Sequence, residues 1–419
     1  MELPSTPKLL KSAALFLSAC ALAAVGARAQ APDASRAADA AVVMERGNPQ
    51  RTGLYPAGPQ APAGVRAWES AKLFQKKRGH TNWGRTITVR DNSGTFTFFG
   101  PDFYWPAPGP RYSDPAVAGG MVYFTAFVND GYLYALDART GQLAWGAKAD
   151  GGTFSSPLVS GETLYVGASG GLFFAFDLKS RQEKWRHNRT DTSYVSHSPV
   201  LVGGVVYYGA TNGILYALDA ATGQPKWQFR TQSRYQSPPA ADGRAVYVAS
   251  DGILYALDAR TGAERWKLQT TEGALSPVVA DGLVYFGDYK GHIRAADAAN
   301  GRLQAKPAQD HQSGTAIAVS GRTIYFGGWD SGSLFAVDSV TREKKWKFSL
   351  SSEANCEAPI TDGRGVYFTC DDGRLYAVDA ETGKKLWTAS AKSGPLSAPV
   401  IADGTLYFIS DEGKAYAVK

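Results

Sequence analysis

The sequence predicts an all-β fold, an eight-bladed β-propeller that is closed by an N-terminal strand and carries an insertion in its first blade. An eleven-residue pattern, Ala-x-Asp-x-x-Thr-Gly-x-x-x-Trp, recurs every 39 to 42 residues along the chain. Short strands repeating at this period are typical of a propeller, in which each repeat is one four-stranded blade. One copy is divided, because the chain stops at Lys419, where a further aspartate would stand, while Trp68 lies far upstream. The two ends are therefore expected to meet in one blade and close a ring.

The copies of the pattern differ in how complete they are. The complete ones are Ala135/Asp137/Thr140/Gly141/Trp145, Ala217/Asp219/Thr222/Gly223/Trp227, Ala256/Asp258/Thr261/Gly262/Trp266 and Ala377/Asp379/Thr382/Gly383/Trp387. The copies around Asp177 and Asp338 lack the glycine, and the copy around Asp297 lacks the tryptophan. Together with the divided copy, these give the count of eight blades.

Each repeat predicts the same order of elements. An inner strand such as 276–279 is followed by a turn at Asp281-Gly282, a second strand over 284–287, another turn, and a third strand ending in Asp. In the Thr-Gly turn that follows, glycine can take positive φ and aspartate can accept hydrogen bonds from nearby backbone N–H groups. The outer strand carries a tryptophan, which we expect to dock into the adjoining blade. Seven tryptophans are thereby interpreted as structural: Trp68, Trp145, Trp185, Trp227, Trp266, Trp346 and Trp387.

The N-terminal residues 1–29 have the features of a secretory signal peptide. Basic residues precede an apolar run over 12–26, and Ala27-Arg28-Ala29 forms a small-x-small cleavage site. Residues 17–20 also fit a bacterial lipobox, in which Cys20 would be lipidated, although the apolar run continues past it. The expected location is the periplasm or the medium, or, if Cys20 is lipidated, the outer membrane. Residues 30–60 are expected to be a leader, and residues 61–419 the propeller.

A long insertion interrupts the first blade. The chain runs 47 residues from Trp68 to Pro115, against 11 to 14 between tryptophan and proline in the intact connections. The insertion, about residues 74–111, mixes lysines and arginines with aromatic rings and predicts a hairpin of 86–90 with 95–99. Cations with exposed aromatic rings are typical of protein interfaces. The binding candidates are Trp83, Tyr104 and Trp105; the alternative is that these rings pack the insertion onto the propeller body.

Polar residues stand near the expected axis of the ring. Blades converge there, and the position before the inner strand is mostly small, as at Ser113, Ser155, Ser237 and Ser397. His197 and Glu357 occupy it in the third and seventh repeats, which face each other across an eight-bladed ring, and Asp114 adds a charge next to Ser113. These groups are candidates for binding a polar ligand or a metal. The alternative is that hydrogen bonds and channel water satisfy them.

Two further departures from the repeat stand out. Trp329 lies in a turn between two strands of the sixth repeat, where no other repeat has an indole, and is either a surface anchor for a partner or buried against a neighbouring turn. Cys356 and Cys370 flank a turn at 362–365 almost symmetrically. They are expected to form either a cross-strand disulfide or a pair of buried thiols, and neither state indicates catalysis.

The repeat resembles that of the PQQ-like propellers, the quinoprotein-type family with docked tryptophans, over residues 111–419 with Trp68 as the closing element. Residues 45–53 also resemble the peptide that often precedes such propellers. The resemblance implies two classes of function. Some members, BamB-like in general form, are exported non-catalytic proteins that bind or assemble other envelope proteins. Others are alcohol or sugar dehydrogenases that use pyrroloquinoline quinone (PQQ) with a metal ion such as calcium.

We favour the non-catalytic class, because this chain lacks residues that are typical of the catalytic members. Catalytic members commonly carry an adjacent Cys-Cys pair beside the cofactor, and the three cysteines here are far apart. No nucleophile with its base, phosphate loop or metal-ligand spacing is recognisable. The formal net charge of +6 over 419 residues is too small to indicate nucleic acid. We expect a monomer that binds another envelope protein without catalysis, cofactor or dedicated metal; a PQQ dehydrogenase is the alternative.

Overall fold

The computed structural model describes residues 42–43, 62–70, 87–91, 94–98 and 111–419, apart from gaps at 128–130, 149–154, 190, 192, 196, 235, 271–273, 289, 305–312, 329–331, 351–353, 392–393 and 395. The described residues form strands and turns, and none of them forms a helix long and apolar enough to cross a membrane. The predicted signal peptide lies outside the described residues, as does most of the leader.

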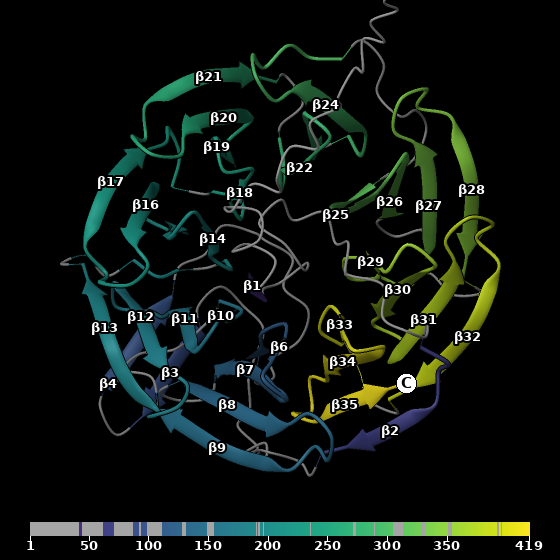
Figure 1. Ribbon diagram of the computed structural model, residues 1–419, viewed down its shortest axis with the longest axis horizontal. Coiled ribbons are helices and arrows are strands. Elements are labelled where there is room, and N and C mark those ends of the chain that lie inside the picture. Colours follow the sequence, from purple (N-terminus) through teal and green to yellow (C-terminus); the bar gives the residue numbers. More distant parts are fainter. Residues whose placement is uncertain are drawn as a thin grey trace, which may run out of the picture.

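The strands form eight blades around a common axis, so the predicted β-propeller is confirmed (Figure 1). The bounds in the first half of the ring are as follows. Blade one has β5 (Arg111–Tyr112), β6 (Ala116–Ala118), β7 (Met121–Phe127), β8 (Tyr132–Asp137) and β9 (Leu143–Lys148); blade two has β10 (Leu158–Ser160), β11 (Thr163–Gly167), β12 (Leu172–Asp177) and β13 (Gln182–Asn188); blade three has β14 (Val200–Val202), β15 (Val205–Ala210), β16 (Ile214–Asp219) and β17 (Pro225–Arg230); blade four has β18 (Ala240–Ala241), β19 (Ala245–Ser250), β20 (Ile253–Asp258) and β21 (Glu264–Gln269).

The second half repeats this order and ends with a strand from the N-terminal side. Blade five has β22 (Val278–Ala280), β23 (Leu283–Gly287) and β24 (Ile293–Asp297); blade six has β25 (Ser313–Ser320), β26 (Thr323–Gly328), β27 (Ser333–Asp338) and β28 (Lys344–Ser349); blade seven has β29 (Ile360–Thr361), β30 (Gly365–Cys370), β31 (Arg374–Asp379) and β32 (Lys385–Ser390); blade eight has β33 (Val400–Ala402), β34 (Thr405–Ile409), β35 (Ala415–Val418) and β2 (Arg66–Glu69). Where the other blades have an outer strand, the described part of blade five has a single bridge between Leu303 and Ala296.

The N-terminal strand β2 closes the ring, as the divided copy of the pattern predicts. It pairs antiparallel with β35, and Trp68 stands opposite Ala417. The same register joins alanine to tryptophan in six other blades, as at Ala135 and Trp145. The backbones of Val65 and Lys419 exchange hydrogen bonds of 2.7 and 2.8 Å, so the two ends of the chain are held in one sheet.

The core lies between neighbouring blades. Every residue of β19 is buried, because both faces of a central strand are covered by the adjoining blades, whereas the outer strand β17 alternates between exposed and half-buried residues. The turn before each outer strand is fixed by its aspartate. In the first copy, Asp137 Oδ1 accepts hydrogen bonds from the backbone N–H and the hydroxyl of Thr140, at 2.7 and 2.8 Å, and these bonds lower the pKa of Asp137. They explain why the sequence pairs aspartate with threonine at this spacing.

Antiparallel strands give the ring two different faces. The face that carries the turns before the outer strands, such as 138–142, is called the Thr-Gly face here. The opposite face carries the turns between the second and third strands and the connections between blades, and is called the connection face. The insertion leaves from the connection face, because it joins β2 to the first strand of blade one.

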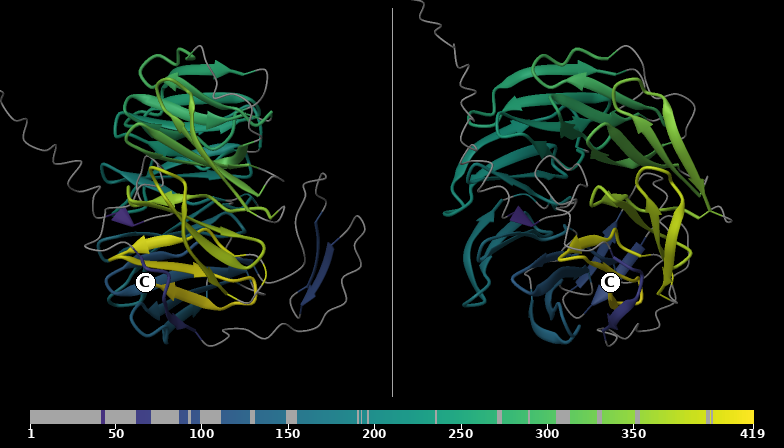
Figure 2. Two further views of the ribbon diagram at one scale, coloured as in Figure 1. Left: turned by 90° about the vertical axis from the view of Figure 1, so that its right-hand side faces the viewer. Right: turned by 45° about the vertical axis from the view of Figure 1, so that its right-hand side comes forward.

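The predicted hairpin of the insertion is present as β3 (Ile87–Asp91) and β4 (Gly94–Phe98), which form a separate two-stranded sheet. Figure 2 shows this hairpin off one face of the ring. Its bounds differ by one residue from the prediction, because Asp91 pairs with Gly94. The ladder thus extends to both ends of what the sequence suggested was a four-residue turn.

A short strand within the predicted leader was not expected. Strand β1 (Val42–Val43) pairs with β10, with Val42 opposite Ser160 and Val43 opposite Val159. It adds to the innermost edge of blade two, and Figure 1 shows it near the centre of the ring. Part of the leader therefore lines the channel instead of lying wholly outside the propeller.

Candidate functional site

The serines that precede the inner strands near the axis make hydrogen bonds within their own blades. Ser155 Oγ accepts a hydrogen bond of 2.8 Å from the backbone N–H of Gly167, which lies twelve residues further on. The same bond, at the same spacing, is made by the serines of three other blades: Ser113 with Thr125, Ser237 with Ala249 and Ser397 with Ile409. The small residues predicted at this position thus bind the second strand of their own blade, and their hydroxyls are already engaged.

Asp114 links the first and last blades. Its Oδ1 accepts a hydrogen bond of 2.9 Å from the backbone N–H of Ala398 in blade eight, and its own N–H donates to Ser156 Oγ at 3.2 Å. The carboxylate therefore bridges the seam between blade eight and blade one. Removing a charged acceptor there leaves the half-buried N–H of Ala398 without this partner.

His197 and Glu357 precede β14 and β29, and these two strands lie on opposite sides of the ring in Figure 1. His197 is half-buried and Glu357 is exposed. The backbone N–H of Glu357 donates to Thr369 O at 2.8 Å, and the backbone N–H groups of Ser113, Ser237 and Ser397 make the equivalent bond in their blades.

These residues do not match the donor set that a calcium-bound quinone requires. Such a site needs several carboxylate or amide oxygens on one metal ion and cations for the quinone carboxylates. Among the described residues, no three His, Cys, Asp or Glu side chains come together, and Asp114 already accepts a hydrogen bond from blade eight. These residues therefore give no basis for a chemical step on PQQ.

The remaining predicted residues fall into two groups. Cys356 and Cys370 form a disulfide that joins the start of blade seven to the end of β30 on the connection face. The others lie outside the described residues: Cys20, Trp83, Tyr104, Trp105 and Trp329.

The seams between blades share one arrangement. In blade three, Trp227 Nε1 and Tyr207 Oη both donate to the same backbone oxygen of blade four, Ala259 O, at 3.0 and 2.8 Å. A Cβ on Gly262 of that next turn would lie 2.6 Å from the indole, so only glycine lets the ring lie flat on the turn. Five seams have both hydrogen bonds, with acceptor oxygens on Ala138, Ala220, Ala259, Ala298 and Ala380.

The closing strand provides a similar seam without a complete copy of the pattern. Trp387 Nε1 donates to Pro62 O at 2.8 Å, and a Cβ on Gly64 would lie 2.6 Å from the indole. Residues 62–64 thus replace the missing Thr-Gly turn of blade eight.

The seam between blades five and six is filled by an arginine. Blade five lacks the tryptophan, and Arg342 of blade six replaces the glycine with a φ of 65°. Its guanidinium carbon lies 5.3 Å from the centre of the Tyr285 ring, and the side chain is buried. The cation therefore covers the tyrosine face that an indole covers elsewhere.

The seam between blades one and two combines an arginine with a tryptophan. Arg181 replaces the glycine with a φ of 60°, but Trp145 is present and its ring centre lies 6.1 Å from that of Tyr123. Neither Trp145 Nε1 nor Tyr123 Oη makes a hydrogen bond to any described residue, whereas their counterparts share a carbonyl oxygen in five other seams. A pocket of about 390 Å³ lies at this position.

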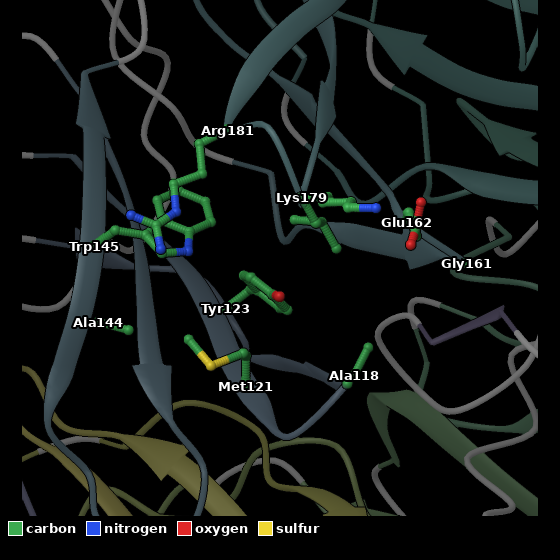
Figure 3. Close-up of a pocket in the computed structure, with 11 residues that line it drawn as sticks. Ala118, Met121, Tyr123, Ala144, Trp145, Gly161, Glu162, Lys179 and Arg181 are labelled. Atoms are coloured by element: carbon green, nitrogen blue, oxygen red, sulfur yellow. The ribbon is translucent and has the colours of Figure 1, made fainter.

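This pocket, called the seam pocket here, is open on the Thr-Gly face (Figure 3). Figure 3 shows Trp145 and Arg181 at one end, with Lys179 and Glu162 toward the other. Its apolar lining comes from Ala118, Met121, Ala144 and Leu178. Burial raises the pKa of Tyr123, so its phenol remains a hydrogen-bond donor at neutral pH.

Sequence reasoning missed the seam pocket, although a signal was present. The loss of glycine at Arg181 was visible as a degraded copy, but its effect depends on whether the preceding blade has a tryptophan. The glycine position of one repeat and the tryptophan position of the preceding repeat, taken together, distinguish the filled seam at Arg342 from the open seam at Arg181.

Comparison with known proteins gives one family and a set of similar folds. A family model described as "Outer membrane protein assembly factor BamB" matches residues 61–235, 216–325 and 304–419. The crystal structure of BamB from Moraxella catarrhalis is 20% identical with a TM-score of 0.62, covering 74% of this chain and 99% of that one. A computationally designed protein, Ika8, is 18% identical with a TM-score of 0.64, covering 74% of this chain and 97% of that one. A quinohemoprotein alcohol dehydrogenase from Pseudomonas putida is 17% identical with a TM-score of 0.67, covering 92% of this chain and 81% of that one. The comparison with curated proteins gives no match.

Proposed function

This chain belongs to the BamB-type family of PQQ-like repeat propellers, and on that premise we propose that it is a non-catalytic scaffold that binds another protein of the bacterial cell envelope. In this proposal residues 1–29 direct export, and the mature ring acts in the periplasm or, if Cys20 is lipidated, at the outer membrane. The name of the matched family refers to assembly of outer-membrane proteins, which agrees with an envelope partner.

The observation that carries the proposal is the use of polar groups at the axis. The serine hydroxyls bind the second strand of their own blade, and Asp114 binds the backbone of Ala398 in the last blade. These groups stabilise the ring, and the insertion and the seam pocket lie on its two faces. Protruding elements and open seams on faces suit contacts with a large partner better than chemistry on a small substrate.

In-cell cross-linking followed by affinity capture tests the proposal. The full chain, tagged at its C-terminus, would be cross-linked in its own host, captured, and mapped by mass spectrometry. We expect an envelope protein in amounts comparable to the tagged chain, with cross-links confined to one face. A variant lacking residues 76–110, compared in parallel, shows whether the insertion contributes. Recovery of the chain with no cross-linked protein beyond that found with an unrelated exported control would contradict the scaffold role.

A further inference from the structure

The seam pocket has two hydrogen-bond donors without an acceptor. In five other seams, the tryptophan Nε1 and the tyrosine hydroxyl converge on one carbonyl oxygen of the next blade. Leu178 is the residue of blade two equivalent to the acceptor alanines, and it lines the pocket, but neither Trp145 nor Tyr123 bonds to its carbonyl oxygen or to any other described residue. The other seams show that an oxygen acceptor satisfies this pair of donors, and in the seam pocket a ligand can provide one. Leaving two donors of this kind without a partner is unfavourable once water is displaced.

The charges around the seam pocket define that acceptor further. Lys179 and Arg181 line the pocket, are exposed, and form no ion pair or side-chain hydrogen bond with any described residue. Two unpaired cations beside two N–H or O–H donors favour a carboxylate over a neutral carbonyl, because charge-assisted hydrogen bonds are the stronger kind. Glu162 lines the same pocket and offers an acceptor for an N–H group.

The apolar lining completes the requirement. Met121, Leu178 and the Trp145 ring provide surface for aliphatic groups, and about 390 Å³ suits a side chain together with parts of its neighbours. A ligand with a carboxylate, an N–H donor and aliphatic groups has the chemistry of a short acidic peptide segment.

We propose that the seam pocket binds an acidic side chain, flanked by aliphatic residues, from the chain of a partner protein. The carboxylate accepts from Trp145 Nε1 and Tyr123 Oη and pairs with Arg181 and Lys179, while a backbone N–H of the peptide donates to Glu162. That the acidic side chain comes from a partner protein rests on the proposed scaffold function, whereas the recognition of a carboxylate follows from the pocket alone.

The test is a peptide titration of the exported protein, observed at the indole N–H signal of Trp145 by NMR. The signal is assigned by its loss in Trp145→Phe. The probes are acetyl-Leu-Asp-Leu-amide, its uncharged counterpart acetyl-Leu-Asn-Leu-amide, and free isovalerate. We expect saturable movement of the Trp145 signal with the Asp peptide, and binding about tenfold weaker with the Asn peptide, because a charged acceptor is replaced by a neutral one.

Matched variants separate the pocket from the general surface. Arg181→Gln and Lys179→Gln are each expected to weaken binding of the Asp peptide about tenfold or more, since each removes a cation from the carboxylate and keeps a side chain of similar length. Arg260→Gln changes the position equivalent to Lys179 in the complete seam between blades three and four, and should leave binding unchanged.

The outcomes distinguish failure of the pocket from failure of the scaffold role. Equal binding of the Asp and Asn peptides, or a Trp145 signal that no probe moves, overturns the carboxylate assignment. If isovalerate binds as tightly as the Asp peptide, the carboxylate site stands but the peptide source is overturned. Loss of the proposed partner in cross-linking, with the Asp peptide still bound, contradicts the scaffold function and leaves the pocket assignment intact.

Discussion

At the scale of single residues, the contact between His187 and Tyr208 shows how two buried polar groups are paired across a seam. His187 Nδ1 lies 2.6 Å from Tyr208 Oη, across the seam between blades two and three. Burial, together with the positive charge of Arg189, lowers the pKa of His187, and burial raises that of Tyr208. Both shifts favour neutral forms, so the contact is a hydrogen bond between a phenol and a neutral imidazole, and the imidazole tautomer sets which of the two donates. Arg189 itself lies over the rings of Tyr208 and Tyr216.

This contact predicts that the protein loses stability on mild acidification. The folded-state pKa of His187 is below its unfolded value, so between the two the unfolded chain binds more protons. The free energy of unfolding should therefore fall as pH drops below about 6.5, the ordinary histidine pKa, and stop falling once the folded-state pKa is passed. In His187→Gln, whose amide can still hydrogen-bond to Tyr208 but does not titrate, the difference in unfolding free energy between pH 7.5 and pH 5.5 should shrink. Urea unfolding at both pH values measures this, and an unchanged difference would remove His187 as its cause.

At the scale of elements, the unit of this fold is the seam, not the isolated blade. A complete seam combines an indole, a tyrosine, one carbonyl oxygen and a glycine, drawn from two neighbouring blades. Arginine replaces glycine twice, and the consequences differ because of the neighbour. Arg342 faces a blade without tryptophan and covers Tyr285, whereas Arg181 faces Trp145 and leaves a pocket.

The same substitution at these two seams should therefore have opposite effects. In Arg181→Gly, the strain of a non-glycine residue at positive φ is relieved, worth roughly 1 to 2 kcal/mol, and Trp145 can dock as in complete seams. The melting temperature should rise. In Arg342→Gly the same relief is offset by a lost cation–π contact and a cavity beside Tyr285, so the melting temperature should fall.

Calorimetry on both variants measures these shifts, with Arg260→Gly as a control on an ordinary turn residue. If both arginine variants change stability in the same direction, the seam account of the two positions is wrong.

The closure and the regular seams could be predicted from sequence, because they follow from a period and a fixed pairing. The divided copy at Trp68 and Ala417 predicted the ring, and the register of alanine opposite tryptophan is the same in seven blades. Strand β1 could not be predicted, because two residues show no alternation. The seam pocket was missed because it depends on two positions in different repeats. At the axis, the sequence located His197 and Glu357 but did not reveal that Asp114 bonds to Ala398.

At the scale of the whole molecule, the departures from regularity are divided between the two faces. The insertion, the disulfide of Cys356 with Cys370, and the residues His197 and Glu357 belong to the connection face. The seam pocket opens on the Thr-Gly face. The two faces therefore carry different irregular features. Such a ring can bind a partner on one face and leave the other face free to bind a second partner.

Titration of the purified mature protein with PQQ in the presence of calcium tests the central claim most directly. In the proposed scaffold, the polar groups at the axis stabilise the ring through hydrogen bonds within and between blades. A quinone enzyme needs the same region for its cofactor, so the two functions predict opposite results. Quinone absorbance and melting temperature would be followed together. We expect neither to show saturable change up to high micromolar PQQ. Saturable one-to-one binding with a raised melting temperature would contradict the account and direct attention to His197 and Glu357.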